Sequence, residues 1–162
     1  MDENFQEVVR RVREKARVLY EGKDVPHHSC GIALAETFSL PTRPYQALRK
    51  GGITGEGLCG AVMAGQIVLG ELLGDPDPTG QVTPALREAM GQFLAAVRGR
   101  VNRGASATLV CNDLTGQFAE FGSGQRLSFC TDIVVTVAEA VAEVLAAQGR
   151  AVDPTPVRFP AT

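Results

Sequence analysis

Residues 58–73 read LCGAVMAGQIVLGELL, and this stretch decides the fold. Apolar side chains occur on nearly every side of the helix that it would form, interrupted only by Gln66 and Glu71. A helix that is hydrophobic all round is buried in a protein core or in a membrane. The stretch is short for a membrane span, so it predicts a central, buried helix. Small residues in its first half leave room for a neighbouring helix or a bulky prosthetic group.

Outward from this stretch, apolar residues recur at helical spacing. Further helices are therefore expected at residues 4–20, 28–39, 45–50, 84–102 and 129–148. Asp2, Thr83 and Ser128 are the expected capping residues of three of them, because short polar side chains accept hydrogen bonds from free N–H groups at helix starts. Residues 104–126 are irregular, and 108–110 fit either a short strand or a helical turn. The sequence predicts an all-α fold: a single-domain bundle of five or more helices at residues 1–152, followed by a Pro-rich extended tail at 153–162.

Composition narrows the classes of partner and the compartment. The chain has 162 residues and a formal net charge of −2. Without a basic surplus, neither nucleic acid nor an anionic membrane is an expected partner. The N-terminus, beginning Met1-Asp2-Glu3-Asn4, lacks the basic and apolar regions of a signal peptide. We therefore expect a cytoplasmic protein, in which cysteines are normally reduced.

The chain contains four cysteines, and no two are close in sequence: Cys30, Cys59, Cys111 and Cys130. No C-x-x-C occurs, so no thioredoxin motif or zinc knuckle is present locally. Cys30, Cys59 and Cys130 fall near predicted helix starts, where the helix dipole lowers thiol pKa and favours nucleophiles and metal ligands. We predict that the tertiary fold brings the cysteines together, with Cys59 as the most reactive or most tightly liganded thiol. The alternative is that each is a small buried hydrophobic residue.

Glycines and histidines near the cysteines are candidate cofactor-binding residues. Gly55, Gly57 and Gly60 match G-x-G-x-x-G, but no strand precedes them, so a dinucleotide site is not indicated. A helix N-terminus can bind an anion, although a tight loop that brings Cys59 close to another backbone is the favoured explanation. His28, with His27, flanks Cys30 and could serve as a ligand or a proton donor. A pair of solvent-facing histidines explains them equally well.

The order of these features resembles a known family. It consists of Cys30, a glycine-rich loop at 51–57, Cys59-Gly60-Ala61 followed by Gly65, Cys111-Asn112-Asp113-Leu114, and Cys130. This pattern, over residues 27–146, is similar to that of the redox-active proteins named after their C-GCAxxG-C-C cysteines. The literal G-C-A-x-x-G is absent, because Leu58 precedes Cys59 and Gly60 follows it. Related domains occur in split-Soret cytochromes, and this resemblance implies an iron–sulfur cluster. A haem is not implied, since no C-x-x-C-H occurs.

These observations favour a redox or electron-transfer protein with one site built from all four cysteines. The cysteines would either bind an iron–sulfur cluster or cycle between dithiol and disulfide. The alternatives, both without redox activity, are a structural zinc site and a helical module that binds a small anion and whose cysteines serve only packing. The sequence identifies neither the redox partner nor an enzymatic reaction. The small residues in the predicted helix at 58–73 are also compatible with a homodimer interface.

Overall fold

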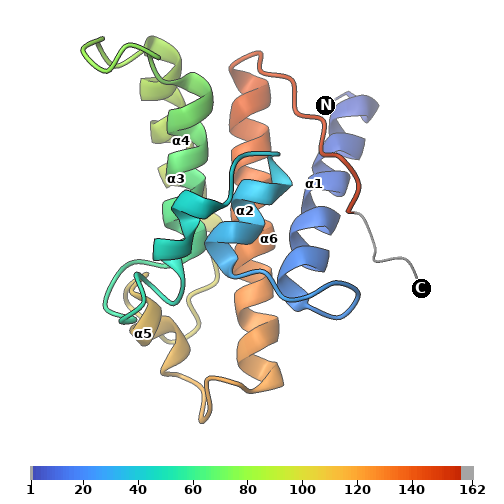
Figure 1. The fold of residues 1–162 in the computed structure, drawn as a ribbon, viewed down its shortest axis with the longest axis vertical. Helices are drawn as coiled ribbons and strands as arrows, with labels where there is room; N and C mark the ends of the chain where they lie inside the picture. The colour runs from blue at the N-terminus through green and yellow to red at the C-terminus, as the bar shows by residue number, and fades with distance from the viewer. Residues whose placement is uncertain (1, 158–162) are drawn as a thin grey trace.

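Helices form nearly all of the regular secondary structure in the computed structural model, which describes residues 2–157 (Figure 1). Within that range the only pairing of β type is an isolated antiparallel bridge between Leu58 and Val110. There are six α helices and one 3-10 helix: α1 (Glu3–Glu21), α2 (Cys30–Thr37), η1 (Arg43–Leu48), α3 (Gly60–Leu73), α4 (Pro84–Arg100), α5 (Cys111–Thr115) and α6 (Gly124–Ala147). The predicted all-α fold of five or more helices is confirmed.

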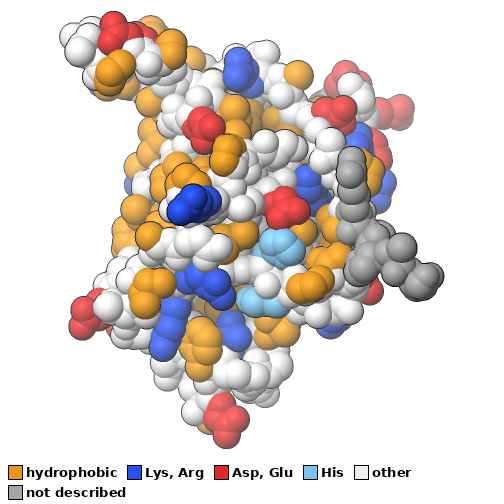
Figure 2. All heavy atoms as spheres, viewed as in Figure 1, with side chains coloured by type: hydrophobic (Ala, Val, Ile, Leu, Met, Phe, Trp, Pro, Cys, Tyr) orange, Lys and Arg blue, Asp and Glu red, His pale blue; other side chains and the backbone are white. Residues whose placement is uncertain are grey.

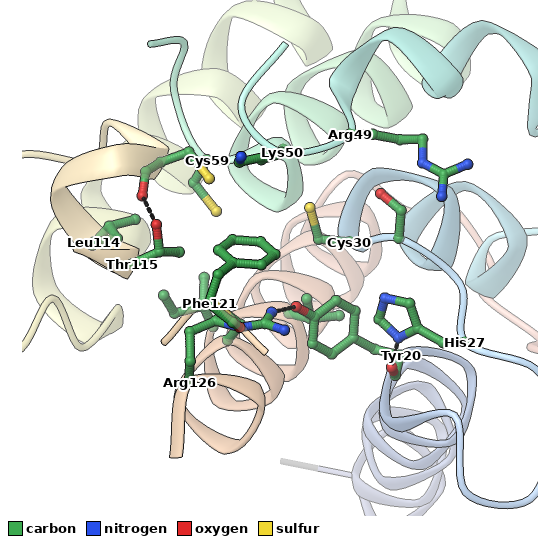
Figure 3. A pocket seen from close by; sticks show the side chains of 16 residues that line it. Tyr20, His27, Cys30, Arg49, Lys50, Cys59, Leu114, Thr115, Phe121 and Arg126 are labelled. Atoms are coloured by element: carbon green, nitrogen blue, oxygen red, sulfur yellow. Dashed lines mark hydrogen bonds between the residues drawn. The ribbon is translucent and has the colours of Figure 1, made fainter. Parts of the chain in front are cut away.

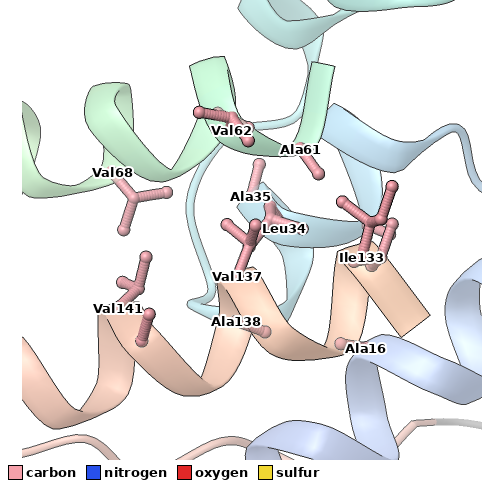
Figure 4. Packing of buried hydrophobic residues seen from close by; sticks show 14 of the residues in the cluster. Ala16, Leu34, Ala35, Ala61, Val62, Val68, Ile133, Val137, Ala138 and Val141 are labelled. Carbon is pink, nitrogen blue, oxygen red and sulfur yellow. The ribbon is translucent and has the colours of Figure 1, made fainter. Parts of the chain in front are cut away.

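The core is shared between α3 and α6. Helix α6 is the longest, and α1, α2, α3 and α4 all pack against it, while α3 also contacts α2, α4 and η1. Figure 4 shows Val68 of α3 opposite Val141 of α6, and Leu34 of α2 beside Val137 of α6. All four side chains are fully buried. The stretch that we expected at the centre is therefore buried as predicted, but α6 lies at the centre together with it.

One of the small residues in α3 serves helix packing. A Cβ atom on Gly65 would lie only 2.6 Å from Cζ of Phe93 on α4 and 3.1 Å from a methyl group of Val137 on α6. Contacts this close are forbidden, so glycine lets the buried Phe93 ring pack directly on the α3 backbone. For Gly65, the close neighbour that the sequence predicted is a helix within the same chain.

Two of the three expected caps are found. The Asp2 carboxylate accepts a hydrogen bond from the Asn4 N–H at 3.2 Å, and Thr83 Oγ1 accepts one from the Leu86 N–H at 3.1 Å. The third prediction is wrong: α6 begins at Gly124, and Ser123 caps it by accepting from the Arg126 N–H at 3.1 Å. Ser123 and Ser128 are both suitable caps, and the earlier one is used, so Cys130 lies in the second turn of α6.

The segment at 104–126 and the C-terminal tail contain little regular structure. The irregular segment 104–126 contains the short helix α5, and residues 108–110 contribute only the Val110 bridge instead of a strand. Residues 151–157 have no regular structure, and Arg11 of α1 donates a hydrogen bond to the Pro154 carbonyl at 2.7 Å. The last residues of the predicted tail, 158–162, lie outside the described residues, and the boundary at 152 stays a prediction. No helix in residues 2–157 has the length and hydropathy needed to cross a membrane.

Candidate functional site

The four cysteines line one cavity of about 180 Å³, where the starts of several helices meet (Figure 3). Each comes from a different element: Cys30 is the first residue of α2, Cys59 is the N-cap of α3, Cys111 is the first residue of α5, and Cys130 lies in α6. The fold therefore brings all four cysteines to one cavity, and their service as one site stays a prediction. Cys30 and Cys59 lie at helix starts, as expected. Cys130 does not, and Cys111 lies at a helix start instead.

The glycine-rich loop before α3 holds Cys59 and Cys111 side by side through its backbone. The Cys111 N–H donates to the Gly57 carbonyl at 2.9 Å, and the Cys59 N–H donates to the Leu109 carbonyl at 2.7 Å. Gly55 has a φ of +79°, and a Cβ atom on it would lie 1.9 Å from Oδ1 of Asn112. Only glycine tolerates both the left-handed backbone and this approach. The interpretation that the loop brings Cys59 close to another backbone is thus confirmed, and that backbone is the start of α5.

Gly60 is the one candidate glycine that lines the cavity. A Cβ atom on Gly60 would lie 2.4 Å from the Leu48 carbonyl oxygen and 2.7 Å from Sγ of Cys30. The end of η1, the start of α2 and the start of α3 can therefore meet only because this residue has no side chain. Gly55 and Gly57, in contrast, lie behind the cavity and shape its wall through α5.

Burial sets the acidity of the thiols in the metal-free, reduced protein. It raises the pKa of Cys30 to about 11 and the pKa of Cys59 to about 12, and nearby thiolates add to both shifts. The pKa of Cys111 is raised by burial as well, and the charges of Lys50 and Arg126 oppose that rise. Backbone N–H groups at the helix starts act in the expected direction on Cys30 and Cys59, but burial outweighs them. These shifts act against a high reactivity of the Cys59 thiol, and its place as the most reactive or most tightly liganded of the four stays a prediction.

A tyrosine and an arginine form the wall beside Cys130. Tyr20 of α1 is buried, and Arg126 of α6 donates a hydrogen bond to its hydroxyl oxygen at 3.0 Å (Figure 3). Burial, together with the charges of the Cys130 and Cys30 thiolates, raises the pKa of Tyr20. The Ser29 hydroxyl, which also lines the cavity, is buried and has no hydrogen-bond partner within residues 2–157.

Only one of the two histidines lies at the cavity. The His27 ring lines the cavity and packs edge-on against Tyr20, with 4.8 Å between ring centroids, and its Nδ1 is hydrogen-bonded to the Tyr20 carbonyl. The candidate His28 lies outside the cavity, with its Nε2 3.0 Å from a carboxylate oxygen of Glu36. Adjacent residues of an extended segment point in opposite directions, and this is why only one of the pair reaches the cysteines.

The cysteines are free thiols. Within residues 2–157, no group of three or more His, Cys, Asp or Glu side chains is arranged to hold a single metal ion. Residues 28–144 match a family model described as "Putative redox-active protein (C_GCAxxG_C_C)". The chain belongs to this family. No curated protein and no solved structure matches it.

The C_GCAxxG_C_C match contains all four cysteines, but part of the cavity wall comes from outside it. Tyr20 and His27 precede the matched residues, 28–144. Sequence reasoning missed Tyr20, Arg126 and Phe121 as cavity residues, because Tyr20 ends an ordinary amphipathic helix and the other two lie in or beside the irregular segment. No local pattern in the sequence marks any of the three.

Proposed function

We propose that this protein transfers electrons and that Cys30, Cys59, Cys111 and Cys130 together hold one iron–sulfur cluster. The observation that carries the proposal is that four thiols, brought from four different elements, line a single cavity. Clusters of the [2Fe–2S] and [4Fe–4S] types both take four thiolate ligands. The family to which the chain belongs is described as redox-active, and a cluster supplies one-electron chemistry when bound.

The chemistry of the donor set supports a cluster over dithiol–disulfide cycling. Disulfide exchange needs an accessible thiolate, whereas burial raises the pKa of Cys30 to about 11 and that of Cys59 to about 12. Metal ligation displaces the thiol protons and so does not require a low starting pKa. The cavity also has the cations Lys50 and Arg126 in its lining, which would offset the negative charge of four thiolates.

The remaining lining residues have definable tasks. Leu114, Ile133 and Val134 give the cavity an apolar wall that limits water. Tyr20, whose hydroxyl oxygen accepts a hydrogen bond from Arg126, lines the same cavity as Cys130 and would place a polar group beside the cluster. These are positioning tasks, and the four cysteines alone are the proposed ligands.

The test is metal and sulfide analysis of protein purified without oxygen. We expect brown protein that contains iron and inorganic sulfide in a ratio of about one to one. Each single Cys→Ser variant should lose most of the iron. Ala64→Ser, which also places a hydroxyl at a buried position of α3 but away from the cavity lining, should keep it.

Other results would point to the alternatives. Colourless protein with bound zinc would replace the proposal by a structural zinc site. Colourless, metal-free protein in which cysteine pairs oxidise and reduce reversibly would establish dithiol–disulfide cycling. If neither metal nor reversible oxidation is found, the redox proposal is wrong and the anion-binding module becomes the better description.

A further inference from the structure

Cationic side chains gather at the cysteine cavity. Arg49, Lys50 and Arg126 line it, and no Asp or Glu does, although the chain as a whole has a net charge of −2. Figure 2 shows Lys and Arg side chains, with hydrophobic side chains beside them, over the part of the molecule where η1, α5 and the start of α6 meet. The local charge around the cavity is therefore opposite to that of the whole protein.

An exposed aromatic ring organises this surface. Phe121 is 46% exposed, the guanidinium carbon of Arg126 lies 4.3 Å from its ring centroid, and Nζ of Lys50 lies 5.3 Å from it. Cation–π attraction holds both charges beside the ring. Arginine and aromatic side chains are the residues most often responsible for binding energy at protein interfaces. We call Arg49, Lys50, Phe121 and Arg126 the cationic rim.

The charges of the cationic rim are available to a partner. Within residues 2–157, none of its three cations forms an ion pair with a carboxylate. Arg49 donates to the side-chain oxygen of Gln46 at 3.2 Å, and Arg126 donates to the Phe121 carbonyl at 2.5 Å. Both partners are neutral, so each hydrogen bond fixes the cation without cancelling its charge.

We infer that the cationic rim is the docking surface for an acidic one-electron carrier protein, one that presents Asp and Glu side chains around its own redox group. This inference rests on the proposed function. In the transfer step the reduced carrier loses one electron and the cysteine site gains one, and no bond is made or broken. Complementary charge speeds the encounter of two such proteins and fixes their orientation.

The position of the rim favours a protein over a small anion as the occupant. The proposed cluster, bound to the cysteines, would fill the cavity itself. Phe121, Arg49 and Lys50, in contrast, are exposed to solvent and would remain accessible to a partner. An exposed ring between cations suits a broad protein contact. The rim is also close to a ligand residue, since Lys50 and Arg126 both act on the charge of Cys111. A carrier that docks there would lie beside the redox site.

The experiment compares two reductants of the anaerobic holoprotein by stopped flow. Reduced flavodoxin serves as the acidic carrier protein, and the methyl viologen radical cation serves as a small reductant that needs no docking. The rim variant is Arg49→Glu, because Arg49 is the rim cation to which no task at the cysteines is assigned. The control variant, Arg87→Glu, changes the charge by the same amount at an exposed position of α4 outside the cavity lining.

With wild-type protein, the second-order rate constant for flavodoxin should fall as salt is added. The rim variant should lower that rate constant by about threefold or more, while the control variant changes it by less than about 1.5-fold. Reduction by methyl viologen should not slow in either variant. Equal effects of the two variants on the flavodoxin rate would overturn the docking surface, because only total charge would then matter.

Two other outcomes also decide the matter. Inhibition by sulfate well beyond that by chloride at the same ionic strength would overturn the protein partner in favour of a small-anion site. If methyl viologen reduces no centre at all, the proposed function itself is wrong and the inference falls with it. Normal reduction by viologen combined with a flavodoxin rate that ignores the rim would remove the docking surface alone.

Discussion

At the scale of single residues, the site depends on a glycine that has a matched counterpart in the same helix. Gly60 begins α3 against Leu48 and Cys30, whereas a Cβ atom on Gly70, in the same helix, would come within 4 Å of no side chain and no other segment among residues 2–157. Gly60→Ala should therefore displace Cys30 or η1 and lower the iron content of protein purified without oxygen. It should also reduce the free energy of unfolding by about 1–3 kcal/mol.

Gly70→Ala is the control for this change. With open space around it and a helical backbone, the added methyl group should keep the iron content and raise the free energy of unfolding by about 0.5–1 kcal/mol. Urea titration measures both variants. Equal iron contents in the two variants would show that the close approach at Gly60 is not needed by the site.

The thiols provide a second prediction at this scale. A raised thiol pKa means less thiolate at a given pH, and the pKa of Cys59, at about 12, is raised further than that of Cys30, at about 11. In reduced, metal-free protein at about pH 8, iodoacetamide should therefore modify Cys59 at least about tenfold more slowly than a thiol of unfolded protein. The difference should shrink as the pH rises toward the pKa of Cys59.

Mass spectrometry of tryptic peptides over time gives the rate at each cysteine. Cys111 is the internal comparison, because it is less buried and two nearby cations act against its pKa rise. Modification of Cys59 ahead of Cys111 would contradict the role that we assign to burial.

At the scale of elements, the long helices and the short ones predicted at 28–39 and 45–50 are found, whereas the short helix α5 was not predicted. The apolar stripe of α1 extends over several turns, its N-cap Asp2 acts as expected, and Gly22, in a left-handed conformation, ends it. Helix α5 is only five residues long, too short to show a periodicity, and it is held by hydrogen bonds to the glycine-rich loop far away in sequence. The start of α6 was misplaced because two serines, Ser123 and Ser128, offer the same local signal.

The junction of α3 and α4 yields a prediction at this scale. Thr83 Oγ1 accepts from the Leu86 N–H at 3.1 Å and donates to the Leu73 carbonyl at 2.6 Å, so one hydroxyl caps the start of α4 and ties it to the end of α3. Thr83→Ala should lower the free energy of unfolding by about 1–2 kcal/mol.

Thr83→Ser, which keeps the hydroxyl, should lower the free energy of unfolding clearly less than Thr83→Ala does. The midpoints of urea unfolding distinguish the two variants. Neither variant should change the iron content, since Thr83 does not line the cavity. A parallel loss in both variants would show that the methyl group, and not the hydroxyl, stabilises the junction.

At the scale of the whole molecule, the sequence predicted that the four cysteines come together in space but not what surrounds them. Their order and their lack of local pairing already required a tertiary site, and all four do line one cavity. The neighbours Tyr20, Arg126 and Phe121 reach the cavity through the packing of α1 on α6 and the path of the segment before α6. Such contacts join residues about a hundred positions apart, as in the Tyr20–Arg126 hydrogen bond, and no periodicity or motif encodes them.

This placement makes a final prediction about stability across the molecule. A group bound by all four cysteines would link the starts of α2, α3 and α5 to α6 while making no contact with the junction of α3 and α4. A ligand that binds only the folded state stabilises it, and regions that open locally gain the most from a ligand that holds them together. Loading iron and sulfide into the reduced protein should therefore slow amide hydrogen exchange in residues 49–60, 109–115 and 124–131.

Exchange in residues 73–90, at the junction of α3 and α4, should change much less unless the whole molecule unfolds to exchange. Cys59→Ser protein given the same treatment should show neither effect, because a cluster would lack one of its four ligands. Uniform slowing along the chain of the wild-type protein would mean that loading stabilises the fold globally. Slowing that spares the glycine-rich loop and α5 would mean that Cys111 is not a ligand, since those two segments hold it in place.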